Sequence, residues 1–185
     1  MKVFSNRRNR IMILMILVTV IFLTGIKSYF NLNPLEAEAV EQSKPLVLNW
    51  LSYDEGLIKA EKEDKYILVF FYSDGCGWCD KMEREVYKNK EVKQLLAGKF
   101  VSVKINASSN NKIEVNGEDI TEKAFALSFQ VTGYPTTWFM ENKDKKIAPL
   151  PGYVPAEQFI TVLKYIGEDW YKTKTFQEYV ESIKS

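Results

Sequence analysis

Apolar runs from residue 46 onward predict five β-strands. The run Tyr66–Tyr72 has no alternating polar residues, which is typical of a central strand that is buried on both faces. Four shorter runs predict the other strands, at 46–50, 100–105, 136–140 and 147–150. A short charged turn at 142–146 joins the last two, so these two strands are expected to be antiparallel.

Helical spacing of apolar residues separates these runs. It predicts helices from Ser52 to about 64, over 79–96, over 121–129 and from Pro155 to about 166. Ser52 and Thr175 each precede a glutamate by three residues, the pattern of a capping box, and Thr175 is expected to begin an extra C-terminal helix. A kink is expected near Asn89, and the polar stretch 107–119, with its Asn-Gly turn signal, is expected to be a loop.

Strands separated by helices predict an α/β fold with a mixed central sheet flanked by helices. The order is β-α-β-α-β-α-β-β-α, followed by the appended helix. One domain over 46–185 accounts for all of these elements.

The first 45 residues have a different character. Four basic residues within 1–10 precede an uncharged apolar run, the pattern of a signal peptide or a signal anchor. The segment 11–30 is expected to form this transmembrane or signal helix, and the positive-inside rule assigns 1–10 to the cytoplasm. Residues 31–45 then form a linker, and the domain lies on the extracytoplasmic side, either periplasmic or extracellular.

Retention of the helix is favoured over its removal. The small-residue pattern Ala37-Glu38-Ala39 lies far downstream of the apolar run, whereas signal cleavage sites follow it closely. A membrane-anchored domain is therefore expected. Secretion after signal cleavage is the alternative.

Composition excludes several kinds of chemistry. A formal net charge of +1 argues against nucleic acid as the main partner, since phosphate binding needs a concentrated basic surface. The chain has no histidine, which removes Ser-His-Asp and Cys-His catalysis. Its two cysteines supply half the ligands of a structural zinc site. We expect no metal and no cofactor, with a zinc ion shared across a dimer as the remaining alternative.

The two cysteines, Cys76 and Cys79, lie between the central strand and a helix. At the helix N-terminus, free amides and the helix dipole stabilise a thiolate, so the pKa of Cys76 is expected below that of a free thiol. The thiolate attacks disulfides, and Cys79, about one turn further on, would resolve the mixed disulfide. Gly77 leaves the approach open, and Trp78 offers an exposed apolar surface to a substrate. A structural disulfide is the alternative, although a loop this short constrains the unfolded chain little.

Three segments carry a family resemblance: 73–83 around the cysteines, 131–136, and Gly152-Tyr153. With them, residues from about 46 to 166 resemble the thioredoxin superfamily. Within it they are similar to exported thioredoxin-like proteins related to the SoxW group and to periplasmic disulfide reductases and isomerases. The resemblance implies a thioredoxin-like fold. It also implies a cis peptide bond before Pro135 that faces Cys76, with the Tyr134 backbone against a substrate strand.

One position departs from the family pattern. Thioredoxins carry a buried acidic residue six positions before the first cysteine, where this chain has Phe70. A proton acceptor for Cys79 is therefore not evident from the sequence. Asp74, Asp80 and Glu83 are near in sequence, but each is expected to be a solvated surface charge.

These features predict an extracytoplasmic thiol-disulfide oxidoreductase. We expect a monomer that acts as a reductase or electron relay on the thiols and disulfides of other proteins, with a membrane electron donor as a further candidate partner. A membrane-tethered peptide-binding or assembly module without redox turnover is the first alternative. A disulfide isomerase ranks lower, because the linker is too short to supply a dimerisation region.

Overall fold

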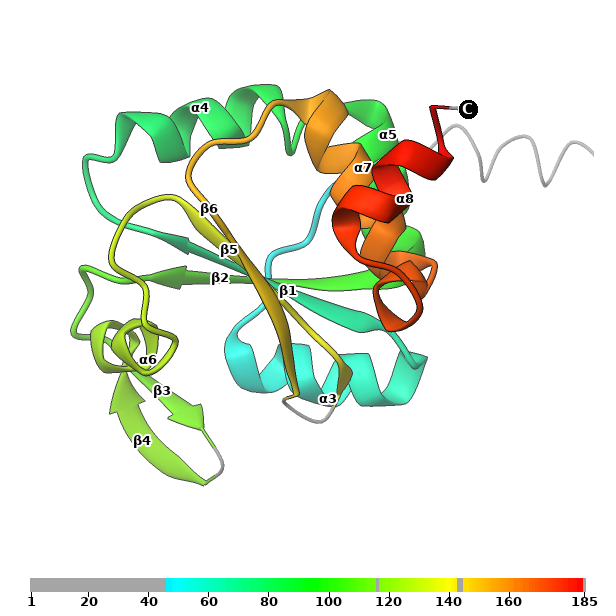
Figure 1. Ribbon diagram of the computed structural model, residues 1–185. Helices are drawn as coiled ribbons and strands as arrows, with labels where there is room; N and C mark the ends of the chain where they lie inside the picture. Colours follow the sequence, from blue (N-terminus) through cyan, green and yellow to red (C-terminus); the bar gives the residue numbers. More distant parts are fainter. Residues whose placement is uncertain (1–45, 116, 143–144, 185) are drawn as a thin grey trace, which may run out of the picture. The chain divides into compact units, whose positions relative to one another are not determined.

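Figure 1 shows a computed structural model of the chain, which describes residues 46–184 except 116, 143 and 144. A four-stranded sheet has the order β2-β1-β5-β6. Its strands are β1 (Tyr66–Tyr72), β2 (Phe100–Asn106), β5 (Thr136–Met140) and β6 (Lys146–Pro151). Strand β1 runs parallel to β2 and antiparallel to β5, and β5 is antiparallel to β6. The predicted mixed sheet with an antiparallel closing pair is confirmed.

Helices cover both faces of this sheet (Figure 1). On one face lie α3 (Tyr53–Glu63) and α6 (Glu122–Ser128), and on the other lie α4 (Gly77–Glu85), α5 (Lys90–Lys99) and α7 (Ala156–Gly167). Strand β1 sends Ile67, Val69 and Phe71 into the first core and Leu68 and Phe70 into the second. Successive side chains of a strand point to opposite faces, so the unalternating apolar run reflects burial on both sides.

The predicted C-terminal helix is present as α8 (Phe176–Ser182), after a short 3-10 turn, η2 (Trp170–Lys172). Its capping box is confirmed. The Glu178 carboxylate accepts a hydrogen bond from the Thr175 backbone (2.8 Å), and the Glu178 amide donates to the Thr175 hydroxyl (3.3 Å). The helix packs on α7 through aromatic rings, with Tyr165 5.2 Å from Phe176 between centroids.

The strand predicted at 46–50 is wrong. These residues have no regular structure, and the next residue, Leu51, makes an isolated parallel bridge to Val103 of β2. The Leu51 amide donates to the Ser102 carbonyl at 3.0 Å. Ser52 follows at once as the N-cap of α3, so the chain turns away before a longer ladder can form.

The predicted loop at 107–119 is also wrong. It contains a hairpin of β3 (Lys112–Val115) and β4 (Glu118–Thr121), paired antiparallel. The sequence did contain evidence for this hairpin, because Asn-Gly between short runs with alternating apolar residues favours a two-residue hairpin turn. Gly117 has φ +82°, which glycine adopts without a steric penalty.

The long helix predicted over 79–96 is two helices, α4 and α5, so the predicted kink near Asn89 is a full break. The Asn89 side chain accepts hydrogen bonds from the amides of Glu91 (2.9 Å) and Val92 (3.2 Å). Asn89 is thus the N-cap of α5, and its extended backbone ends any continuous helix.

The N-terminal predictions, including the helix at 11–30, lie outside the described residues. Across 46–184, leaving aside the three undescribed positions, no helix is long and apolar enough to cross a bilayer.

Helix α3 approaches β2 closely at Gly56. A Cβ added there would lie 2.3 Å from the Val103 Cγ2. We expect Gly56→Ala to lower the free energy of unfolding by about 1–3 kcal/mol, because the buried contact must shift. Gly98→Ala in α5 is the matched control, since its added Cβ meets nothing within 4 Å, and a gain of about 0.5–1 kcal/mol is expected. Urea unfolding of both variants measures the difference, and equal stabilities would contradict the close contact.

Candidate active site

Cys76 and Cys79 form a disulfide, with an Sγ–Sγ distance of 2.04 Å, at the start of α4. Cys76 is the N-cap of this helix, and its Sγ accepts a hydrogen bond from the Cys79 amide at 3.1 Å. Its carbonyl accepts from the Asp80 amide, also at 3.1 Å. The expected position of Cys76 at a helix N-terminus is confirmed, and one amide of the first turn, that of Cys79, donates to its sulfur.

The loop before the disulfide is tied to the end of β2. Gly75 has φ +71°, which turns the chain from β1 into α4. The Asp74 amide donates to the Ser108 hydroxyl at 3.2 Å, and the Asn106 side chain donates to the Asp74 carboxylate at 2.8 Å. Asp74 thus holds the loop in place, and it is exposed as expected.

The two sulfur-bearing residues differ in exposure. Cys79 is 1% exposed and belongs to the core cluster that includes Phe70 and Met82. Cys76 is partly exposed. An incoming disulfide can therefore meet Cys76 from solvent, whereas Cys79 is reached through Cys76.

Trp78 is 59% exposed, as expected, and lies in a small surface cluster. Its ring centroid is 5.6 Å from that of Tyr153, and the Lys81 Nζ lies 4.7 Å from the Tyr153 centroid. The Tyr153 hydroxyl donates to the Glu85 carboxylate at 2.8 Å, and this bond raises the pKa of Tyr153. Lys81 lies in the 73–83 segment, but its contact with Tyr153, like that of Glu85, could not be predicted, because Tyr153 is far along the chain from both.

The peptide bond between Tyr134 and Pro135 is cis, as the resemblance implied. In the β1–β5 ladder Thr136 lies opposite Phe71, so Pro135 precedes β5 at the same edge of the sheet where β1 leads to Cys76. This register supports the prediction that Pro135 faces Cys76, which stays a prediction. The Pro135 carbonyl accepts from the Gly152 amide at 2.7 Å.

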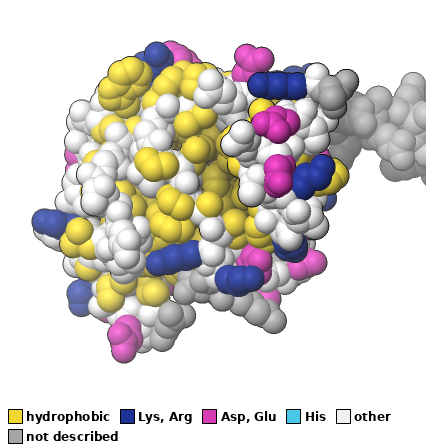
Figure 2. Space-filling view, in the orientation of Figure 1, with side chains coloured by type: hydrophobic (Ala, Val, Ile, Leu, Met, Phe, Trp, Pro, Cys, Tyr) yellow, Lys and Arg dark blue, Asp and Glu magenta, His cyan; other side chains and the backbone are white. Residues whose placement is uncertain are grey.

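A shallow groove of about 420 Å³ adjoins this loop. Apolar and aromatic side chains line much of it: Phe129, Val131, Tyr134, Trp138, Pro149 and Pro151. Figure 2 shows hydrophobic side chains gathered on the face over β5 and β6, with charged side chains mostly around them. A polypeptide with apolar residues beside its cysteine would match such a surface.

Phe70 is fully buried, so no acidic group lies at this central-strand position. Its ring lies 5.7 Å from Trp50 and 5.0 Å from Tyr87, between centroids. Asp80 is exposed, as expected. Glu83 also meets solvent, with its side chain 35% exposed, and its carboxylate forms an ion pair with Lys104 of β2 at 2.7 Å that the sequence did not predict.

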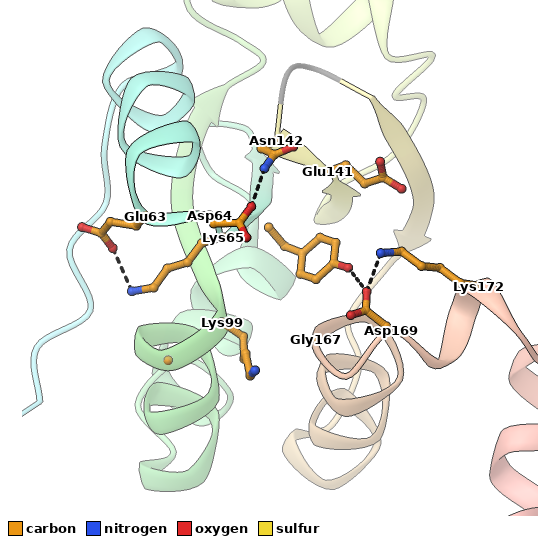
Figure 3. A pocket seen from close by; sticks show the side chains of 11 residues that line it. Glu63, Asp64, Lys65, Lys99, Glu141, Asn142, Gly167, Asp169 and Lys172 are labelled. Carbon is orange, nitrogen blue, oxygen red and sulfur yellow. Dashed lines mark hydrogen bonds and ion pairs between the residues drawn. The ribbon is translucent and has the colours of Figure 1, made fainter.

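A polar cavity of about 400 Å³ lies at the opposite end of β1, around Tyr66 (Figure 3). Four of its charged groups form two ion pairs: Lys65 with Glu63 at 2.8 Å, and Lys172 with Asp169 at 2.7 Å. Tyr66 begins β1, whereas Cys76 follows the end of that strand. This cavity is therefore separate from the disulfide.

Comparison with known proteins identifies the family. A family model described as a thioredoxin-like domain matches residues 53–167, and the chain belongs to this family. Together with the disulfide-bonded Cys-x-x-Cys pair, the family and fold make the chain a thioredoxin-like thiol-disulfide oxidoreductase.

Individual relatives agree with this class. The disulfide bond reductase DsbH of Chlamydia pneumoniae is 28% identical over 122 residues, covering 64% of this chain and 72% of DsbH. The thiol:disulfide interchange protein DsbD of Pseudoalteromonas atlantica is 25% identical over 77% of this chain, which spans 23% of DsbD. A solved thioredoxin-fold protein from Helicobacter pylori has a TM-score of 0.54 and 29% identity, covering 65% of this chain and 81% of that one.

The unequal exposure of the cysteines has a measurable consequence. After reduction with dithiothreitol, we expect iodoacetamide to alkylate Cys76 at least about tenfold faster than Cys79, because thiol reactivity follows access and thiolate character. Peptide mass spectrometry at short reaction times measures both rates. Equal rates would contradict the burial of Cys79.

Proposed function

We propose that this chain is an extracytoplasmic thiol-disulfide oxidoreductase that reduces, or relays electrons to, the disulfides of other proteins. The observation that carries the proposal is the pairing of a partly exposed Cys76, at the N-terminus of α4, with a buried Cys79. Attack by the exposed sulfur and resolution by the buried one is the reaction sequence that this arrangement supports.

In the reduced protein, the Cys76 thiolate attacks one sulfur of a partner disulfide. A Cys76–partner bond forms, and the partner's other sulfur leaves as a thiolate that takes a proton. Cys79 then attacks the Cys76 sulfur, which forms the Cys76–Cys79 disulfide and releases the partner's second thiol. The partner gains two electrons and two protons, and the Cys76–Cys79 dithiol loses them.

The partner's chain is proposed to lie between Trp78 and the loop of Tyr134 and Pro135. Exposed aromatic surface on both residues supports this placement: Trp78 is 59% exposed and Tyr134 is 36% exposed. A Cβ added at Gly77 would meet nothing within 4 Å, so the approach over the helix start is open. Aromatic rings with this exposure favour contact with an apolar polypeptide segment.

Direction and compartment are parts of the same proposal. The relative DsbH is named a disulfide bond reductase, which supports net reduction. The basic and apolar pattern of 1–30 supports export and anchoring through 11–30, with the domain outside the cytoplasm. The protein would act as a monomer on protein thiols and disulfides and take its electrons from a membrane donor.

Removal of the resolving cysteine tests the exchange. We expect Cys79→Ala to accumulate partner proteins as mixed disulfides on Cys76, because no second thiol releases them. Non-reducing gels of the full chain, with and without dithiothreitol, measure these adducts. The Cys76→Ser variant is the matched control and should form none. Absence of reducible adducts with Cys79→Ala would refute the exchange. Full cellular function of a Cys76→Ser, Cys79→Ser double variant would favour a binding module.

The reduction potential tests the direction. Equilibration of the purified protein with glutathione buffers should give a Cys76–Cys79 potential near the reducing end of the thioredoxin range, about −270 mV rather than about −120 mV. A strongly reducing dithiol can pass electrons to most protein disulfides. A potential near the oxidising end would refute the reductase role and leave the exchange chemistry intact.

A further inference from the structure

To resolve the mixed disulfide, Cys79 must lose its proton while it is buried in the apolar core. Its attack needs a thiolate, and thiols in apolar surroundings resist ionisation. Cys79 is 1% exposed, and fully buried Phe70 and Met82 belong to the same cluster. A proton acceptor for this step must therefore come from a neighbouring element other than the centre of β1.

Glu83 lies four residues after Cys79 on α4. Side chains at this spacing lie on one face of a helix, with Cβ atoms about 5–6 Å apart. A general base can take a proton directly or through one water, so the two groups need not be in contact. The Glu83 side chain is 35% exposed and turns toward the sheet, where its carboxylate meets the Lys104 Nζ at 2.7 Å. The carboxylate is thus directed to the flank of the core that contains Cys79.

Lys104 determines where along the sheet this carboxylate lies. It is the register partner of Phe70 across the β1–β2 ladder, and its Nζ lies 4.4 Å from the Tyr72 ring centroid. The ion pair therefore brings a carboxylate from α4 beside position 70 of the central strand. Thioredoxins carry their buried acidic residue at this strand position. Its side chains are 24% and 35% exposed, which keeps the pair in contact with solvent.

Two other carboxylates, Asp74 and Glu122, lie near Tyr72, but both accept hydrogen bonds from Asn106: Asp74 from its side chain at 2.8 Å and Glu122 from its backbone amide at 3.0 Å. Burial raises the pKa values of Tyr72 and Tyr87, so both stay neutral phenols near neutral pH. A cavity of about 420 Å³ on this flank connects Glu83 to solvent. Other charged residues that line it are Asp80, Arg84, Lys88 and Lys93. Of these only Asp80 is a carboxylate, and it is exposed.

We propose that Glu83, positioned by Lys104, accepts the Cys79 proton during resolution, an inference that rests on the proposed function. The Cys79 S–H proton passes through one water to the Glu83 carboxylate as the Cys79 sulfur attacks Cys76. The Cys76–Cys79 bond forms, the Cys76–partner bond breaks, and the partner leaves as a thiolate. Glu83 then gives up the proton to the solvent-filled cavity, and the thiolate takes a proton from water.

A two-phase assay separates this step from the first attack. Reduced protein and dithio-bis-nitrobenzoate release one coloured thiolate when Cys76 attacks and a second when Cys79 resolves. In Glu83→Gln we expect an unchanged first phase and a second phase about 100-fold slower at neutral pH, the scale of a lost general base. The deficit should shrink as pH rises, because hydroxide then deprotonates Cys79. Added formate should restore part of the second phase.

Asp80→Asn is the matched control, since it removes the neighbouring carboxylate that lines the same cavity. Its second phase should stay within about twofold of the unmodified protein, well short of a lost general base. A Glu83→Gln second phase with normal rate and pH profile would overturn the inference, and so would a loss confined to Asp80→Asn. Absence of the first phase in the unmodified protein would instead refute the proposed function, so the two failures are distinguishable.

Discussion

The site depends on how β1 ends. This strand is buried on both faces, which fixes it in the middle of the sheet and fixes the point where the chain leaves it. The chain then turns through Gly75 and starts α4, whose first turn includes Cys79 against the sheet. One cysteine is therefore held in the core and the other at the surface by the same short connection. The unequal chemistry of the pair follows from this placement.

The two strands beside β1 complete the site at the end of the sheet where β1 stops. Antiparallel β5 begins beside the end of β1, which brings the cis-proline loop to the edge where the disulfide lies. Parallel β2 ends there too, and Asn106 holds the loop through Asp74. Because both neighbours hydrogen-bond to β1, a change in β1 register would move the proline loop and the loop anchor together.

Local sequence patterns predicted most of the fold. The features that they did not predict depend on contacts between residues far apart in the sequence. The apolar runs at Tyr66–Tyr72 and 136–140 and the capping box at Thr175 gave their elements directly, because periodicity and caps are local. The strand at 46–50 failed because Ser52 starts a helix at once. The ion pair of Glu83 was not predicted, because its partner, Lys104, comes from a strand whose register no local pattern sets. The two cysteines were evident because their motif is contiguous, whereas the cis bond before Pro135 followed only from the family resemblance.

Phe70 explains why the acidic group would come from a helix. A carboxylate in the middle of β1 would be buried among rings and would cost several kcal/mol unless paired. Phe70 instead packs against Trp50 and Tyr87 and strengthens the core under the disulfide. On our proposal, the acid on α4 reaches the same level through Lys104 while staying in contact with solvent. A partly exposed ion pair has a smaller desolvation cost than a buried one. Its carboxyl group can also exchange a proton with water without opening the core.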